Sequence, residues 1–334
     1  MYTAMVSTRL SSGEPLQIGV VEPAGDTAWA PRVLATLAHK SAVNRLHLEG
    51  AFRGDLDDLE TLFYVGTVAN EIVTVAMLAG GHGAAVYGHV YTQPVWRRRG
   101  AASTLHRVLG DDWRRRGYRV VTLGTDATGH ARRLYEGIVG FGPLVAGRGD
   151  MIWRDGPEFG DVGPLPSAAA GVLRWGDWGW VSAACCAPVQ PEEELPRSVL
   201  FRARSVHCVG WPFIVAMTGG GGGQMAPAEV PVLRRGEAVV GWASVLPDAA
   251  QVLGAAALEL YLQPGARTEA AADALLSALR WPKGMVVHVC TATQDYRSAA
   301  MIRHGFVRRK ILPGWWDLGR GREDAALWSR APRR

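Results

Sequence analysis

Apolar residues in the first half of the chain fall into short runs that alternate with polar or glycine-containing turns. This pattern predicts three consecutive strands, at Tyr64–Ala69, Ile72–Ala79 and Ala85–Thr92. Because the turns between the runs are short, we expect these strands to form an antiparallel meander.

A helical period follows the third predicted strand. Leu105, Val108, Leu109 and Trp113 recur at the spacing that places side chains on one face of a helix, and Gly117 is typical of the position just after a helix end. The half is completed by a predicted strand at Val120–Gly124 and a second helix around Ala131–Gly137.

The second half repeats this order of elements. Thr268 is a favourable N-cap for its helix, because a threonine hydroxyl can accept from the first-turn N–H groups. The predicted elements are strands at Val230–Leu233, Ala238–Val245, Ala255–Leu262 and Met285–Cys290, with a helix at Thr268–Leu279 before the last strand.

Two short identities indicate that the halves are copies of one another. Tyr91-Thr92-Gln93-Pro94 matches Tyr261-Leu262-Gln263-Pro264, and Gly140-Phe141 matches Gly305-Phe306, in the same order and at nearly the same separation. We therefore interpret the chain as an internal duplication. The predicted fold class is α+β, with two tandem domains that each contain a mixed, mostly antiparallel sheet flanked by helices.

The boundary between the halves is marked by composition. From Gly156 to Gly171 the chain is rich in glycine, proline and alanine and has no hydrophobic period, which is typical of a linker. We expect an N-terminal domain at 1–158, a linker at 159–171, a C-terminal domain at 172–318 and a frayed basic tail at 319–334.

Composition and charge exclude several classes of protein. With 334 residues, 48% of them hydrophobic and 20% charged, the chain can form two packed cores and is not disordered. Thirty-six basic and 31 acidic side chains give a net charge of +5, which suits an anionic ligand but does not indicate nucleic acid.

No targeting or membrane signal is visible. The four cysteines have neither metal-type nor disulfide-dense spacing, no apolar stretch reaches about 20 residues, and Met1–Gln17 lacks the regions of a secretory signal. We expect a cytoplasmic protein without a metal, either a monomer or a homodimer.

The segment Gln93–Ser103 has the chemistry of an anion site. It joins a predicted strand to a predicted helix, whose first N–H groups are unpaired and carry a partial positive charge. Gly100 and Ala102 keep side chains away from the backbone, and three arginines precede them. The alternative interpretation is an ordinary turn with a solvated basic face.

This segment resembles a known family. Arg97-x-x-Gly100-x-Ala102 is similar to the Q/R-x-x-G-x-G/A signature of the GNAT superfamily of acyl-CoA-dependent N-acyltransferases, and Ala131-x-x-Leu134-Tyr135 followed by Gly140-Phe141 is similar to that family's next conserved segment. Two departures stand out: Arg98 occupies a position where glycine is common, and one extra residue separates Tyr135 from Gly140.

The resemblance implies that acyl-CoA is the cosubstrate. Backbone groups of Val90, Tyr91 and Thr92 would pair with its pantetheine arm and supply an N–H to the oxyanion. Tyr135 would protonate the departing thiolate, the alternative being a core tyrosine. The residues expected to hold the diphosphate are Arg97, Arg98, Arg99, Gly100, Ala101, Ala102 and Ser103.

Two histidines are candidates for the general base. His89 lies on the strand that enters the site, although its side chain could also point to the opposite face of the sheet. His207 belongs to the second half and would reach the site if the halves enclose the acceptor.

The second half keeps the pattern of elements but lacks the arginine cluster. We align Ala266 with Gly100 and expect diphosphate binding there to be weak or absent. The tryptophans after the linker, including Trp175, Trp178 and Trp180, suit a wall for a bulky acceptor.

The expected function is acyl transfer from acyl-CoA to the amine of a small-molecule acceptor held between the halves. The tandem layout resembles the teicoplanin-type lipoglycopeptide N-acyltransferases, which implies a fatty acyl chain, an aminosugar and a glycopeptide antibiotic. The alternatives are tandem acetylation of a smaller amine, such as an aminoglycoside, and a non-catalytic protein that holds acyl-CoA permanently.

Overall fold

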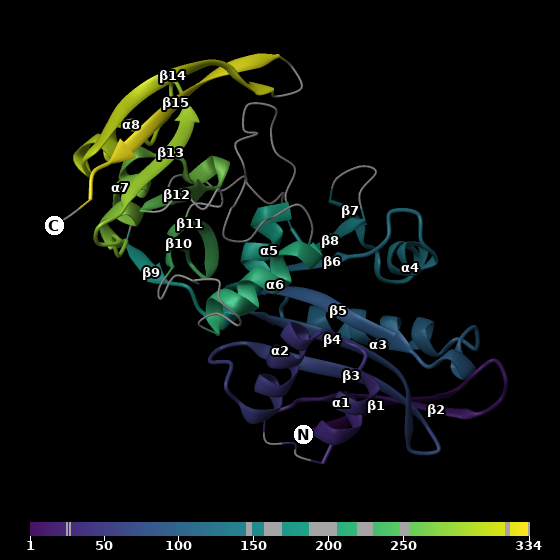
Figure 1. Ribbon diagram of the computed structural model, residues 1–334. Coiled ribbons are helices and arrows are strands. Elements are labelled where there is room, and N and C mark those ends of the chain that lie inside the picture. The colour runs from purple at the N-terminus through teal and green to yellow at the C-terminus, as the bar shows by residue number, and fades with distance from the viewer. Residues whose placement is uncertain are drawn as a thin grey trace. The chain divides into compact units, whose positions relative to one another are not determined.

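The computed structural model describes residues 1–24, 26, 28–144, 149–156, 169–186, 206–218, 230–247, 254–317 and 321–332 (Figure 1). These residues form two compact units. Among the described residues, unit 1 contains those of 1–156, 174–186 and 206–214, and unit 2 contains those of 169–173 and of 215–332.

Unit 1 is built on an eight-stranded sheet, sheet A, whose strand order is β1-β2-β3-β4-β5-β6-β8-β7. All neighbours are antiparallel except β5 and β6, which are parallel. The strands are β1 (Tyr2–Arg9), β2 (Pro15–Val21), β3 (Glu60–Val68), β4 (Glu71–Gly81), β5 (Ala84–Thr92), β6 (Val120–Gly124), β7 (Gly142–Pro143) and β8 (Asp150–Arg154).

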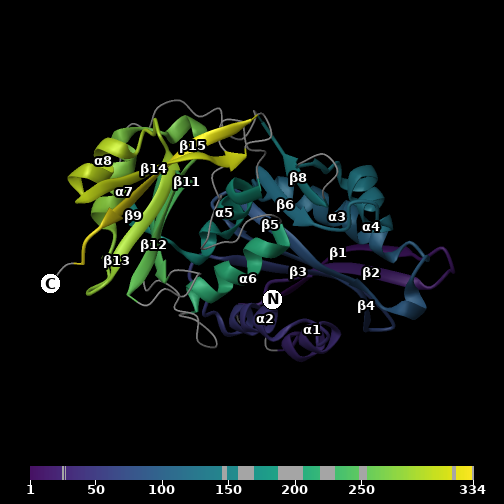
Figure 2. The ribbon, with the colours of Figure 1, turned by 45° about the horizontal axis from the view of Figure 1, so that its top comes forward.

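Helices lie on both faces of sheet A. Figure 2 shows the sheet between the pair α1 (Ala30–Thr36) and α2 (Ala42–Arg53) and the pair α3 (Ala101–Arg115) and α4 (His130–Leu134). The predicted strands at 64–92 and the predicted helix around Trp113 are confirmed as β3, β4, β5 and α3.

The apolar face of α3 explains why this helix forms and where it packs. Leu105, Leu109 and Trp113 are fully buried, in one core cluster with Leu62 and Tyr87 of the sheet. Burying each such side chain contributes about 1.5–3 kcal/mol, so the amphipathic period is the main reason for the helix.

Unit 2 contains a seven-stranded sheet, sheet B, in the order β14-β15-β13-β12-β11-β10-β9. Helices α7 (Glu269–Ala278) and α8 (Ser298–Arg303) belong to this unit. The strands are β9 (Ala170–Val172), β10 (Pro231–Arg235), β11 (Ala238–Pro247), β12 (Ala255–Leu262), β13 (Val286–Ala292), β14 (Phe306–Asp317) and β15 (Arg322–Arg330).

The strand order confirms that the two halves share one arrangement of strands and helices. In each sheet one parallel pair lies between antiparallel strands: Ala84–Val86 of β5 pair with β6, and Ala255–Ala257 of β12 pair with β13. A long crossover that contains a helix, α3 or α7, joins the two strands of each parallel pair. Two mixed, mostly antiparallel sheets flanked by helices are the predicted fold class.

The predicted boundaries differ from the units in two places. The segment 174–186, expected in the C-terminal domain, packs in unit 1, where it forms the short 3₁₀ turn η3 (Trp175–Asp177) and α5 (Trp178–Cys186). Most of the predicted linker lies outside the described residues, but 170 and 171 belong to β9. The glycine run 219–223 also lies outside them.

The prediction of a frayed basic tail is wrong for residues 322–330. These residues form β15, between β14 and β13, because the apolar stretch Ala325–Trp328 is long enough for a strand despite its charged ends. Arg330 is buried, donates from Nε to the His304 carbonyl at 2.8 Å and lies over the Trp281 ring. Within the described residues, no helix has the length and apolar character needed to cross a membrane.

Candidate active site

The turn between β5 and α3 contains two residues with positive φ values. After the 3₁₀ turn η1 (Pro94–Trp96), Arg98 has φ +60° and Gly100, the N-cap of α3, has φ +88°. A Cβ at Gly100 would meet nothing within 4 Å, so glycine is required here by its φ value and not by crowding. Arg98 adopts a left-handed conformation, which explains why glycine is common at this motif position.

The first turn of α3 has N–H groups available for a ligand. The helix has no side-chain cap and no acidic residue in its first turn, and its first internal bond runs from Thr104 N to Gly100 O. The N–H groups of Ala101, Ala102 and Ser103 therefore precede the helical hydrogen-bond ladder. Together with the positive end of the helix dipole, they can bind phosphate oxygens.

The three arginines of the turn have different surroundings. Arg97 donates from Nε to the Thr92 carbonyl at 3.1 Å, which ties the turn to the end of β5. Arg99 forms an ion pair with Glu14 at 3.0 Å. Arg98 is exposed to solvent. The guanidinium groups of Arg97 and Arg99 thus help to shape the turn.

The second half has a different turn at the corresponding place. Arg267 is the counterpart of Arg97, because each Nε donates at 3.1 Å to the carbonyl of the last residue of its strand. The alignment of Ala266 with Gly100 is therefore wrong, since Ala266 precedes Arg267. The N-cap of α3 follows three residues after Arg97, whereas Thr268, the N-cap of α7, follows Arg267 directly.

The start of α7 is occupied by its own side chains. The Thr268 hydroxyl accepts from Ala271 N at 3.1 Å, and Glu269 adds a carboxylate to the first turn. Both features satisfy or neutralise the positive end of the helix. The two halves thus differ at this point although their folds match.

Strand β5 carries a bulge at the predicted catalytic position. The register passes from Met77↔Gly88 to Val75↔Tyr91, so His89 and Val90 together oppose one residue of β4. His89 has φ +51°. A bulge shifts the alternation of side chains. Val90 accordingly packs against the core cluster on the α3 side.

Pairing between β5 and β6 ends before the bulge. The parallel register covers Ala84–Val86 alone, although β5 continues to Thr92. Two of the residues expected to pair with pantetheine already use their carbonyls. The Tyr91 carbonyl accepts from the Thr74 hydroxyl of β4 at 3.2 Å, and the Thr92 carbonyl accepts from Arg97. Val90 lies at the bulge.

Sheet B lacks this arrangement. The register between β11 and β12 runs without a break from Gly241↔Leu262 to Pro247↔Ala256. The buried Arg297 donates from Nη1 to the carbonyl of Leu260, the residue that corresponds to Val90, at 2.9 Å, and it is also paired with Asp295.

The extra residue between Tyr135 and Gly140 is accommodated by a π-helical turn. Residues Tyr135–Val139 form η2, directly after α4, and Gly140 N donates to Tyr135 O at 3.2 Å, across five residues. An insertion of one residue into a helix produces this geometry, which occurs often at functional sites.

Tyr135 is 6% exposed and lies on the α3 side of sheet A. Its ring centroid is 5.9 Å from that of Tyr87 and 5.4 Å from that of His106. Burial raises the pKa of Tyr135 to about 12, so the phenol keeps its proton at neutral pH.

His89 is close to a histidine that the sequence did not single out. His47 of α2 is fully buried, and burial together with the charge of His89 lowers the pKa of His47 to about 3. His47 contacts the rings of Trp178 and Trp175, at centroid distances of 4.9 and 6.4 Å.

His207 lies in α6 (Val206–Met217), and residues 206–214 of this helix belong to unit 1 and not to the second half. The side chain of His207 lies outside the described residues.

The tryptophans expected to contact an acceptor are mostly buried. Trp175, Trp178 and Trp180 are 5%, 4% and 6% exposed and pack in unit 1, and Trp242 and Trp328 are buried in unit 2. Trp175, Trp178 and Trp180 are buried because the whole segment docks on the end of the β4–β5 hairpin, where Trp180 Nε1 donates to His82 O at 3.0 Å.

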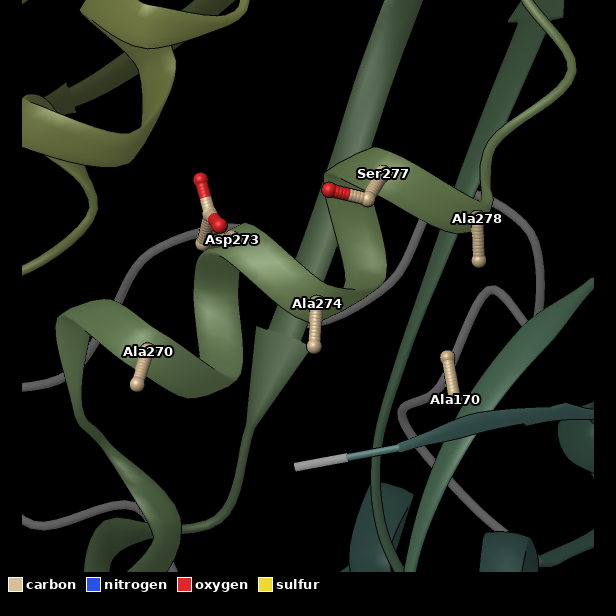
Figure 3. A pocket seen from close by; sticks show the side chains of 6 residues that line it. All are labelled: Ala170, Ala270, Asp273, Ala274, Ser277 and Ala278. Atoms are coloured by element: carbon tan, nitrogen blue, oxygen red, sulfur yellow. The ribbon is translucent and has the colours of Figure 1, made fainter. Parts of the chain in front are cut away.

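A shallow hollow of about 550 Å³ lies on unit 2 (Figure 3). Asp273 and Ser277 of α7 line it, with His304 close by. Nε2 of His304 lies 3.2 Å from Asp273 and 3.5 Å from Ser277. Because both oxygens approach the same nitrogen, these residues cannot form a catalytic relay, which needs one nitrogen for each partner. In the described part of the chain, no group of His, Cys, Asp or Glu side chains is arranged to hold a metal ion.

No family model matches the chain, and no curated protein matches it. The GNAT domain of S. lividans PAT is a similar solved structure, with 15% identity and a TM-score of 0.35 over 45% of this chain and 96% of that chain. The ribosomal-protein-S18-alanine N-acetyltransferase from Escherichia coli has 14% identity and a TM-score of 0.30 over 50% of this chain and 94% of that chain. A third similar structure, yncA from Salmonella typhimurium with its cofactor acetyl-CoA, has 21% identity and a TM-score of 0.30 over 42% of this chain and 93% of that chain.

Proposed function

We propose that the chain is an acyl-CoA-dependent N-acyltransferase whose cosubstrate binds to unit 1. The observation that supports this most directly is the contrast between two equivalent helices. The start of α3 has a left-handed glycine and uncapped N–H groups, whereas the start of α7 is closed by Thr268 and Glu269. Only the first of these suits a diphosphate.

The residues of unit 1 fit the proposed cosubstrate. The N–H groups of Ala101, Ala102 and Ser103 would hold the diphosphate, and the open space at Gly100 would let the ligand approach the backbone. The edge of β5 near Val90, which lies beyond the pairing with β6, would pair with the amides of the pantetheine arm. Bound in this way, the cosubstrate would supply an activated acyl group as a thioester.

Tyr135 would act on the sulfur as a hydrogen-bond donor. Its pKa of about 12 lies above the value near 8.5 of an ordinary thiol, so complete proton transfer to a thiolate would be uphill by about 5 kcal/mol. A neutral phenol can nevertheless stabilise the developing thiolate charge. The raised pKa of Tyr135 supports charge stabilisation in place of the full protonation that the family resemblance implies.

His89 is the better candidate for the base that receives the amine proton. It lies in the bulge of β5, next to Val90 at the edge proposed to pair with the pantetheine arm.

The placement of the diphosphate is tested by Gly100→Glu. A carboxylate at this position would repel the phosphates, and we expect the variant to lose measurable CoA binding in titration calorimetry. Gly117→Glu is the matched control, because Gly117 also has a positive φ (+79°) with open space around it but lies at the other end of α3. Unchanged CoA affinity in Gly100→Glu, or equal losses in both variants, would refute the placement.

The finer proposal, transfer of a fatty acyl chain to an aminosugar of a glycopeptide, is tested by thermal shifts with CoA thioesters of increasing chain length. A ligand at a hundred times its dissociation constant adds about 2.7 kcal/mol of stability. Shifts that increase with chain length would support the lipid-transferring enzyme, and equal shifts would support acetyl transfer to a smaller amine.

A further inference from the structure

A chain of hydrogen bonds lies buried beneath the proposed diphosphate site. The Tyr87 hydroxyl is 2.7 Å from Nε2 of His106, and Nδ1 of the same imidazole is 2.6 Å from the carbonyl oxygen of Ala102. Tyr87 is 2% exposed and His106 is fully buried. Neither residue has a role in the proposed reaction.

The positions of the protons in this chain follow from its acceptor. The Ala102 carbonyl can only accept, so Nδ1 of His106 carries the hydrogen and Nε2 accepts from the Tyr87 hydroxyl. Burial lowers the pKa of His106 to about 4, against the opposing effect of its bond to Ala102, so the imidazole is neutral at pH 7. The Tyr87 hydroxyl, both ring nitrogens of His106 and the Ala102 carbonyl then each have a hydrogen-bond partner.

These hydrogen bonds connect the two parts of the proposed cosubstrate site, which are the edge of β5 and the first turn of α3. Tyr87 lies on β5, two residues before His89 at the bulge, and Ala102 lies in the first turn of α3. The rings of Tyr87 and His106 also contact Tyr135. Tyr87 and His106 therefore contact each other and Tyr135, and they join β5 to the start of α3.

We propose that Tyr87 and His106 are positioning residues that fix the distance between the edge of β5 and the first turn of α3, so that one CoA molecule can bind both at once. This inference rests on the proposed function. A ligand that spans two elements binds most tightly when the elements are already at the required separation, because no binding energy is then spent on ordering them.

The same helix offers a matched comparison. At the far end of α3, the hydroxyl of the buried Tyr64 of β3 donates to Asp112 at 2.7 Å. This bond also joins a strand to α3 but touches neither the bulge nor the first turn. Tyr64→Phe and Tyr87→Phe each remove one buried hydroxyl and keep the ring.

The experiment compares two probes by titration calorimetry: CoA, which would contact both the helix start and the strand edge, and ADP, which would contact the helix start alone. We expect Tyr87→Phe to weaken CoA binding about tenfold and to change ADP binding less than twofold. Tyr64→Phe should change neither. A thermal melt of each variant confirms that it is folded.

The outcomes separate this inference from the proposed function. If the wild-type chain binds CoA but Tyr87→Phe binds it equally well, or loses CoA and ADP affinity to the same extent, the positioning role is wrong and the proposed function stands. If Tyr64→Phe weakens CoA as much as Tyr87→Phe does, the effect is general destabilisation, and the positioning role is again wrong. If the wild-type chain binds neither probe, the proposed function itself fails.

Discussion

At the scale of single residues, the site depends on groups whose environment sets their chemistry. Burial raises the pKa of Tyr135 to about 12, and its hydroxyl forms no hydrogen bond to the described residues. Arg98 shows the reverse case, since its side chain is exposed while its backbone has the left-handed conformation that the turn requires. A mutation of Tyr135 therefore tests side-chain chemistry, and a mutation of Arg98 tests backbone geometry.

Tyr135→Phe tests the role of the phenol. We expect turnover to fall about tenfold to a hundredfold, because one donor to the leaving sulfur is lost, while CoA affinity stays within twofold. The melting temperature should change little, since no protein group loses a hydrogen bond. Steady-state kinetics together with calorimetry check this, and unaltered turnover would remove Tyr135 from the mechanism.

At the scale of elements, the two helices that follow the equivalent strands β5 and β12 begin differently, because the start of α3 has no side-chain cap and the start of α7 is capped by Thr268. The turn before α3 has two more residues between its arginine and its N-cap than the turn before α7, and these residues create the left-handed positions. The bulge in β5 has no counterpart in the unbroken register of β11 and β12. Small local insertions thus distinguish two copies of the same fold.

The capping of α7 can be measured through Thr268→Ala. Loss of the hydroxyl that accepts from Ala271 N should lower the stability of unit 2 by about 1 kcal/mol. The number of CoA molecules bound should stay at one per chain, because Glu269 still opposes an anion. Denaturant unfolding and calorimetry give the two values; a second equivalent of bound CoA would contradict the proposed difference between the helices.

At the scale of the whole molecule, the chain returns to unit 1 after its midpoint. Asp58 accepts from Gly176 N at 2.8 Å, and the ring of Trp178 packs against His47 and Phe213, all within unit 1. Burial alone would raise the pKa of Asp58, but the bonds from Gly176 and His82 and the charge of Arg174 lower it. This carboxylate therefore stabilises unit 1 above its unfolded pKa near 3.8, and that contribution is lost as the pH falls through the lower folded value.

Trp178→Ala tests which unit the segment stabilises. We expect a loss of about 3–5 kcal/mol in the unfolding transition that CoA raises, which would belong to unit 1. Trp242→Ala, which removes a fully buried ring of unit 2, should lower the other transition instead. Differential scanning calorimetry with and without CoA separates the two. A Trp178→Ala effect confined to the transition that CoA does not raise would contradict the assignment.

The sequence by itself determined the elements that depend on local periodicity. The strands from Tyr64 to Thr92, the helix that ends before Gly117 and the repeated order in the second half follow from hydrophobic spacing and turn residues, which act over a few neighbours. The candidate diphosphate turn was visible for the same reason, since glycine and arginine act through local backbone geometry and charge.

Only the tertiary structure decided what depends on distant contacts. The pairing of Tyr87 with His106, the docking of 174–186 on unit 1 and the strand at 322–330 all join residues far apart in the chain. A one-residue bulge reverses which side chains reach a face, and a charged segment becomes a strand when a neighbouring edge can bind it. Such outcomes depend on partners that no local pattern contains.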